Sequence, residues 1–225
     1  MDILEQTKPN KNKWISFLAD GVLSGLMLGI GGMVSLSSEN RFLGAFLFSL
    51  GLFCIVQFKY GLFTGKVGYI VNRDLPYVAE TAVTLVGNAL GTLIAALLLR
   101  QVRFFTSTDV TISDRVQATV AGKIHDNPLS IFILAIFCGI LMFTAVEGSR
   151  KCKEEKNFAG SLFVVVMPVM VFIICGFNHC IADMFYYFFA GCPEPSKAIV
   201  YFILAIAGNS VGGMIVPLLK KLSNQ

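Results

Sequence analysis

Apolar residues are gathered into six long runs, and short polar segments separate one run from the next. The runs extend over about 14–35, 42–71, 77–99, 129–146, 158–190 and 197–219. A run of about 20 apolar residues is long enough to cross the hydrocarbon core of a bilayer as a helix. The pattern therefore predicts an all-α polytopic membrane protein with six transmembrane helices.

Polar residues interrupt two of the six runs. The second run contains QFKYGLFTGK at Gln57 to Lys66, and the fifth contains GFNHCIAD at Gly176 to Asp183. Irregular backbone at membrane depth occurs only where protein buries it or where it lines a water-filled cavity. An ionisable residue there marks a functional site by default. We therefore expect helices two and five to be broken at these points.

A short repeat relates the third run to the sixth. The motif GNxxGxxI occurs at 87–94 and again at 208–215, and each copy follows an interrupted run. Because each unit has three spans, the second unit must enter the membrane from the opposite side. The sequence predicts an inverted 3+3 repeat, an arrangement that places transport sites near the bilayer midplane at broken helices. Repeat one covers about 14–100 and repeat two about 128–221 of a single six-span domain at 14–221.

Composition excludes an ordinary soluble domain. The chain of 225 residues is 55% hydrophobic and 14% charged, with a mean hydropathy of +0.72, whereas soluble domains are about 25% charged. The net charge of +4 does not indicate nucleic-acid binding, because most basic residues lie between the apolar runs, where they set membrane orientation. We expect a lipid bilayer around the chain and no nucleic-acid partner.

Basic residues predict the orientation. With the N-terminus inside, the inner segments hold ten of them, at Lys8, Lys11, Lys13, Arg73, Arg150, Lys151, Lys153, Lys156, Lys220 and Lys221, and the outer segments six, at Arg41, Arg100, Arg103, Arg115, Lys123 and Lys197. This excess predicts a cytoplasmic N-terminal segment at 1–13 and a cytoplasmic tail at 222–225 in the cell (inner) membrane. The first run is long enough to span and has no small-residue cleavage pattern, so we expect no signal peptide.

Three motifs carry a family resemblance. They are LFTG at 62–65, GFNHCIADM at 176–184 and the GNxxG of the last run, and Lys123 lies at the expected spacing before the fourth run. Over Trp14 to Leu219 the chain resembles the formate/nitrite transporter family of formate, nitrite and hydrosulfide channels. The resemblance implies an aquaporin-like protomer with its own pore in a homopentamer, passing small monovalent anions without a cofactor and without enzymatic activity.

The resemblance also implies a set of pore residues. Two apolar constrictions would enclose a chamber, and they map to Phe48, Leu52, Leu62, Phe63 and Phe172. The chamber residues map to Thr64, Lys123, His179 and Asn209. Lys123 would attract the anion from the polar segment 100–127, which we expect to be an external loop. His179 would act as proton relay or hydrogen-bond donor, because a histidine ordinarily titrates near neutral pH, and Thr64 would hold its ring.

Five positions depart from the family pattern. The acid usual before LFTG is Gly61 and the asparagine usual after it is Lys66, while Gly139 replaces an asparagine in the fourth run. The residues usual on either side of the histidine, a glutamate and an asparagine, are here Asn178 and Asp183. These departures suit a divergent, hydrosulfide-type branch. We expect Asp183 to cap the half-helix after the break.

Two other functions fit parts of the pattern. Cys175, His179 and Asp183 are spaced by four residues, which on a continuous helix would place them on one face as a zinc or iron site. A break in that helix would remove this alignment. An aquaporin-like pore for a neutral solute is the nearer alternative, although neither interruption contains the Asn-Pro-Ala sequence usual in aquaporins. Lys59 and Lys66 are expected to snorkel or to pair locally.

Overall fold

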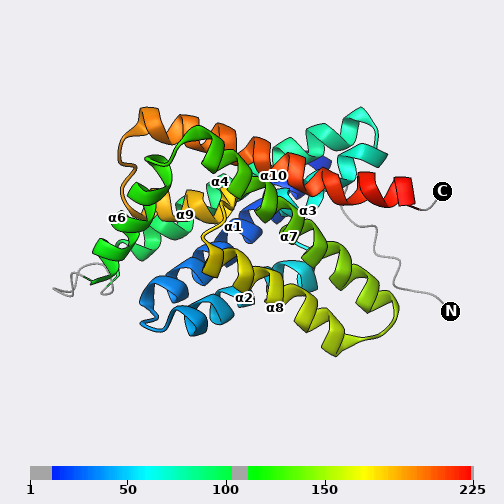
Figure 1. The fold of residues 1–225 in the computed structure, drawn as a ribbon, viewed down its shortest axis with the longest axis horizontal. Coiled ribbons are helices and arrows are strands. Elements are labelled where there is room, and N and C mark those ends of the chain that lie inside the picture. Colours follow the sequence, from blue (N-terminus) through cyan, green and yellow to red (C-terminus); the bar gives the residue numbers. More distant parts are fainter. Residues whose placement is uncertain (1–11, 103–110, 224–225) are drawn as a thin grey trace.

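All regular secondary structure in the described residues, 12–102 and 111–223 of the computed structural model, is helical (Figure 1). Six helices are long and apolar enough to cross a membrane: α1 (Lys13–Ser37), α2 (Arg41–Phe58), α4 (Leu75–Leu99), α7 (Pro128–Glu154), α8 (Phe158–Cys175) and α10 (Pro195–Ser223). These helices confirm the all-α, six-span prediction. The basic residues at 1–11 and Arg103, which contributed to the orientation argument, lie outside the described residues.

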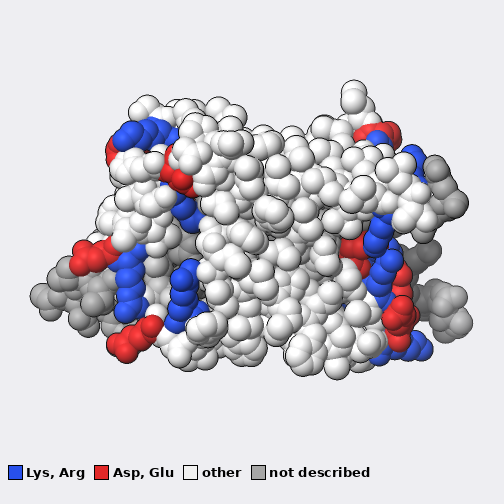
Figure 2. Space-filling view, viewed as in Figure 1, with Lys and Arg blue, Asp and Glu red and all other residues white. Residues whose placement is uncertain are grey.

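The surface has the composition expected of a protein surrounded by lipid. In Figure 2, Lys, Arg, Asp and Glu gather near the two ends of the long axis, and the surface between them is almost free of charge. Large apolar side chains of the long helices are exposed, among them Phe46, Leu50, Val86, Phe137, Phe163 and Ile203. Such exposure is costly in water and normal in a bilayer, where helix exteriors meet hydrocarbon.

Within the described ranges, four shorter helices lie between the long ones. They are α3 (Phe63–Lys66), the 3₁₀ helix η1 (Val67–Asn72), α6 (Thr111–Ile124) and α9 (Cys180–Phe189). Residues 59–62 separate α2 from α3, and residues 176–179 separate α8 from α9. Both α2 and α8 end in a left-handed residue, Lys59 with φ 60° and Gly176 with φ 72°. Glycine adopts this conformation without strain, whereas lysine does so at a cost.

The glycines of the repeated GNxxG motif permit two close helix pairs. A Cβ atom on Gly91 would clash with the main-chain carbonyl of Val22, and one on Gly212 would clash with the carbonyl of Ile136. The first glycine therefore lets α4 pack directly on α1, and the second lets α10 pack directly on α7. Small residues allow helix backbones to approach in this way when lipid supplies no hydrophobic driving force.

Three boundaries differ from the sequence predictions. The segment expected to be an external loop contains α6, which buries Val116 and Val120. The apolar pattern of this segment is too weak to predict a helix, and packing of these two side chains stabilises it. Helix α7 continues to Glu154 through the charged segment, where Arg150 pairs with Glu147 and Glu154 at helical spacing. Helix α10 reaches Ser223, beyond the expected end of the last span.

Candidate functional site

The two interruptions meet through Thr64 and His179. Thr64 lies in the first turn of α3, and His179 is the last residue before α9. Thr64 Oγ1 and His179 Nε2 are 3.1 Å apart, and the two side chains are 0% and 1% exposed. The contact joins residues 115 positions apart in the sequence. A polar pair so deeply enclosed by apolar helices is the arrangement expected of a functional site in a membrane protein.

His179 caps α9, and the cap defines its tautomer. Its Nδ1 atom accepts a hydrogen bond from the main-chain N–H of Ala182 at 3.1 Å. A nitrogen that accepts cannot carry a proton, so the ring is neutral and its proton is on Nε2. Nε2–H therefore donates to Thr64 Oγ1. The side chain uses one nitrogen to hold the helix and presents the other as a donor.

Asp183 does not cap α9, contrary to the expectation from the sequence. His179 occupies the N-cap position, and Asp183 lies one turn further along the helix. Its carboxylate accepts a 2.6 Å hydrogen bond from the Tyr201 hydroxyl and forms a 3.1 Å ion pair with Lys123 Nζ. The side chain is 5% exposed, and a buried carboxylate requires partners of this kind. Groups that are distant in sequence but close in space thus determine the role of Asp183.

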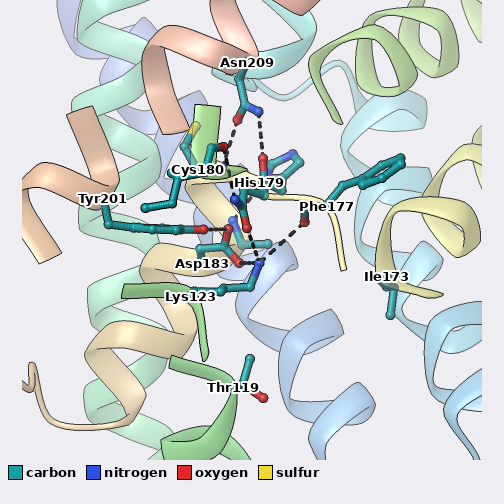
Figure 3. A network of polar contacts seen from close by, with 12 residues as sticks. Thr119, Lys123, Ile173, Phe177, His179, Cys180, Asp183, Tyr201 and Asn209 are labelled. Carbon is teal, nitrogen blue, oxygen red and sulfur yellow. Dashed lines mark hydrogen bonds and ion pairs between the residues drawn. The ribbon is translucent and has the colours of Figure 1, made fainter. Parts of the chain in front are cut away.

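Lys123 reaches the second interruption from the last turn of α6 (Figure 3). Its Nζ atom donates to Asn178 Oδ1 at 2.8 Å, lies 3.5 Å from the carbonyl oxygen of Phe177, and pairs with Asp183. The side chain is 18% exposed. Lys123 is therefore a largely enclosed helical residue rather than a solvated loop residue, and its charge is balanced by the Asp183 carboxylate.

Asn88 of α4 holds the first interruption. Its Oδ1 atom accepts from the main-chain N–H of Phe63 at 2.9 Å, which satisfies a free donor at the start of α3. Its Nδ2 atom donates to the carbonyls of Gly21 at 2.9 Å and Gly61 at 2.8 Å. One fully buried amide thus ties α1, α4 and the interruption together.

Asn209 of α10 makes the corresponding set of bonds at the second interruption. Its Oδ1 atom accepts from the N–H of Cys180 at 2.9 Å, and its Nδ2 atom donates to the carbonyls of Ala135 and Asn178, both at 2.8 Å. Figure 3 shows the side chain of Asn209 pointing toward Cys180 and the non-helical segment before it. Both amide hydrogens are already donated to the main chain, so this conformation leaves neither for an anion.

The residues expected to form constrictions are all buried. Phe48 of α2 and Phe172 of α8 contact edge to face, with ring centroids 5.7 Å apart. The Phe172 ring is also 5.5 Å from the ring of His179. Leu52, Leu62 and Phe63 are no more than 6% exposed. The structure thus places apolar rings next to the histidine and places Phe63 directly before Thr64 on α3.

Two cavities lie at opposite ends of α2. One has a volume of about 380 Å³, lies beside α3 and is lined by Leu62, Gly65 and Lys66 among others. The second, of about 520 Å³, is lined by Lys123, Phe172 and Asp183 together with residues at the end of α1. We call them the α3 cavity and the α6 cavity. Leu62 belongs to the wall of the α3 cavity and is two residues before Thr64, while Phe172 belongs to the wall of the α6 cavity and contacts the His179 ring.

The sequence profile of one family matches residues 4–221, nearly the whole chain, and its description is formate/nitrite transporter. The chain belongs to the formate/nitrite transporter family. Similar members include the formate channel FocA of Haemophilus influenzae, 26% identical over 79% of this chain and 67% of the relative. The formate-nitrite transporter of Plasmodium knowlesi is 26% identical over 90% of this chain and 74% of the relative.

Solved structures show that the chain shares its fold with known channels. The chain matches a pentameric formate channel with formate bound, at a TM-score of 0.76 and 24% identity, over 96% of this chain and 99% of the other. It also matches an ion channel of the family at a TM-score of 0.76 and 17% identity, over 94% and 89% of the two chains. This family member is therefore a multi-pass membrane protein with the fold of a transport family.

The alternative metal site is not assembled by this fold. In the described ranges, no three His, Cys, Asp or Glu side chains lie close enough together to hold a metal ion. Residues 176–179 are not helical, so the spacing that would align Cys175 with His179 and Asp183 does not apply. Cys175 is exposed at the end of α8, while the other two side chains are buried.

Sequence reasoning missed two residues that complete the site. Tyr201 of α10 donates to Asp183, and no local pattern in an apolar run distinguishes this tyrosine from its neighbours. Asn178 appeared only as a departure from the family pattern, yet its side chain accepts from Lys123 and donates to the carbonyl of Ile131 at 3.2 Å. The role of Asn88 was also not predicted, although its position in the repeated motif, matching that of Asn209, was a signal that could have indicated it.

Proposed function

We propose that this family member passes small monovalent anions, such as formate, nitrite or hydrosulfide, through a pore within the chain. The observation that carries the proposal is the buried Thr64–His179 contact. Thr64 follows Leu62 of the α3 cavity wall by two residues, and the His179 ring lies beside Phe172 of the α6 cavity wall. The pathway runs from the α3 cavity past Leu62 and Phe63 to this pair. It then runs past Phe172 and Phe48 to the α6 cavity and Lys123.

His179 acts in this proposal as a hydrogen-bond donor. Its Nε2–H is the only ring group left for a substrate, because Nδ1 is engaged with Ala182. An anion that reaches the chamber can replace Thr64 as the acceptor, which offsets part of the hydration it lost at the apolar rings. Proton transfer from Nε2 would first require a proton on Nδ1 and loss of the helix cap. The donor role is thus the simpler of the two predicted roles.

Lys123 attracts the anion from the α6 cavity. The Lys123–Asp183 pair is electrically balanced as a whole, yet the ammonium group also lies beside the carbonyl of Phe177 at the entrance to the second interruption. An arriving anion meets the ammonium group as a donor and competes with Asp183 for it. Because the Lys123–Asp183 pair has no net charge, it is also compatible with passage of the anion's neutral conjugate acid. In that case the pore would pass a neutral solute, as in the aquaporin-like alternative.

The matching bonds of Asn88 and Asn209 support the inverted repeat. Each asparagine lies in the span that follows an interrupted one. Its side chain accepts from the first N–H of the short helix after the interruption and donates to the carbonyl two residues before that helix starts. Three spans in each unit give the two units opposite directions. We place both termini in the cytoplasm of a cell-membrane protein, as the basic residues predict. The pentameric state of the structurally similar formate channel supports a homopentamer with one pore in each copy.

The experiment is anion uptake into proteoliposomes that contain the purified protein. Formate, nitrite and hydrosulfide are compared at two pH values, with glycerol as a neutral solute and protein-free liposomes as the background. We expect uptake of at least one anion well above background, and hydrosulfide uptake above the others if the five departures define the divergent branch. Glycerol uptake without any anion uptake would overturn the proposal in favour of the neutral-solute pore.

A further inference from the structure

The α3 cavity is strongly basic. Four cationic side chains line it, from Lys59, Lys66, Arg150 and Lys153, and none of the described residues in its wall is acidic. The α6 cavity differs, because its wall combines Arg41, Arg115 and Lys123 with the acids Glu39 and Asp183. The α3 cavity therefore has the more positive wall, although it is the smaller of the two cavities.

Three of the four cations in the α3 cavity lack an acidic partner. The Arg150 guanidinium is bound by the carboxylates of Glu147 and Glu154. Within 4.0 Å of Lys59, Lys66 or Lys153 there is no carboxylate among the described residues. Arg150 thus contributes little net charge to the cavity, whereas Lys59, Lys66 and Lys153 have no carboxylate of the described residues at ion-pair distance.

The ammonium group of Lys66 is held by contacts with α1 and α4. Its Nζ atom donates to Thr84 Oγ1 at 3.2 Å and lies 4.5 Å from the ring centroid of Phe17, a cation–π contact. Glu80 and Asp20 act on it from beyond ion-pair distance, and Glu80 is already paired with Lys13. Lys66 is in the same four-residue helix as Thr64 and is one of the residues that line the α3 cavity.

Lys153 of α7 also lines the α3 cavity. Its Nζ atom donates to the carbonyl of Val56 near the end of α2 at 2.8 Å, which brings α7 against the interruption. Lys59 is the left-handed residue at that same end of α2. The three lysines thus come from α7, α3 and the end of α2, and all three line a cavity whose apolar wall includes Leu62.

We propose that Lys59, Lys66 and Lys153 form an anion-binding site in the α3 cavity, where a small anion is held before it passes Leu62. The proposal deepens the proposed function and rests on it. Clustered charge in a low-dielectric cleft concentrates counter-ions by a factor of about 10 to 1,000. The site should also bind a divalent oxyanion too large and too charged to pass, and such an ion would compete with the transported anion from this side only.

Formate uptake in membrane vesicles of known orientation tests the proposal, with sulfate as the competing anion. The end of α10 lies on the side of the α3 cavity, since Gly213 packs beside Gly68 and Lys220 acts on Glu147. Protease access to a C-terminal tag therefore reports which side the cavity faces. The half-saturating formate concentration is measured with sulfate on one side, at constant ionic strength maintained with gluconate.

Sulfate on the side of the α3 cavity is expected to raise the half-saturating formate concentration roughly 3- to 10-fold, and sulfate on the other side to leave it nearly unchanged. The triple variant Lys59→Gln, Lys66→Gln, Lys153→Gln should lose this effect, and the matching triple arginine variant should keep it. Lys221→Gln, which removes a charge from the same end outside the cavity, should behave as the unaltered protein. Lys153→Gln alone should weaken the effect and serves if the triple variant does not fold.

Equal competition from both sides, or competition that persists in the triple glutamine variant, would overturn this inference while formate uptake still supports the proposed function. Absence of formate, nitrite and hydrosulfide uptake in unaltered vesicles would overturn the proposed function and this inference together. Competition should also weaken at about 0.5 M salt, because exposed charges are screened over only a few ångströms there.

Discussion

Asn88 and Asn209 hold the two interruptions of the chain with the same three hydrogen bonds. Each side chain is fully buried, accepts from the first N–H of a half-helix, and donates to two main-chain carbonyls. The residues are 121 positions apart in the sequence, from 209 − 88. Irregular backbone can persist inside a membrane protein only if its polar groups are paired, and these two amides provide the pairing.

Replacing either asparagine is expected to destabilise the protein. In Asn88→Ala or Asn209→Ala, a buried N–H and two carbonyls lose their partners, at roughly 1–3 kcal/mol for each group left unsatisfied. The thermal midpoint in detergent should fall clearly for both variants and by similar amounts. Ser210→Ala is the matched control, because that hydroxyl bonds only the carbonyl of Ile206 in its own helix. A midpoint unchanged from the control would contradict the bracing role.

Removing Lys123 is expected to leave a buried carboxylate without its cation. Lys123→Met should cost on the order of 3 kcal/mol, because breaking one side of a buried ion pair strands the other charge. Adding Asp183→Asn should recover much of that loss, since the stranded charge is then gone. Denaturation of the two single variants and the double variant measures the coupling. Simple addition of the two single effects would show that the pair is not coupled.

Asp183→Asn alone is expected to strengthen anion binding at the α6 cavity. The ammonium group of Lys123 would keep its bond to Asn178 while losing its counter-charge. The half-saturating formate concentration on that side should fall several-fold, an effect of one added charge in a partly enclosed site. Glu39→Gln removes a carboxylate from the same cavity without touching Lys123 and serves as the control. An equal change in both variants would mean that only overall charge matters.

His179→Asn separates the two roles of the histidine. Asparagine is a good N-cap residue, so its Oδ1 atom can replace Nδ1 in holding the N–H of Ala182. It is too short to reproduce the donor at Nε2. We expect a thermal midpoint close to that of the unaltered protein and formate uptake reduced roughly tenfold, whereas His179→Ala should lower both by loss of cap and donor. Full uptake by the asparagine variant would remove the donor role.

Phe172→Ala is expected to widen the passage on the side of the α6 cavity. The ring contacts both Phe48 and His179, so its loss removes one wall beside the chamber. Uptake of acetate should rise relative to formate, because the larger anion gains more from the added space. Phe163→Ala, on the exposed side of the same helix, should leave the ratio unchanged. Equal acetate-to-formate ratios in the two variants would mean that Phe172 does not limit the passage.

Acid is expected to release the loop between α9 and α10. Hydrogen bonds from Lys197 and His125 hold the pKa of the Glu194 carboxyl below its usual value. The ionised carboxylate therefore stabilises the folded loop above its unfolded pKa of about 4.3, and this contribution is lost as pH falls through the lower folded-state pKa. Amide-exchange protection at 191–197 should fall over that acid window. Glu194→Gln should flatten the dependence, and Glu155→Gln, at the far end of α7, should not.

The sequence alone determined the class of the protein and the positions of its polar interruptions. Six runs long enough to cross a bilayer leave few alternatives, because each must satisfy its backbone within a helix. The motifs at 62–65 and 176–184 brought Thr64 and His179 into one hypothesis, and the structure brings them to 3.1 Å. These features depend on local composition and spacing, which a sequence records directly.

Only the tertiary structure decided what the charged residues do. Asp183 was expected to cap a helix, since acids favour helix starts, but Lys123 from α6 and Tyr201 from α10 are its partners. Lys59 and Lys66 were expected to snorkel or to pair locally, and both line a cavity whose wall also holds Lys153. A charge takes its role from groups that are close in space, and long-range packing of helices brings those groups together. Local sequence patterns do not contain that information.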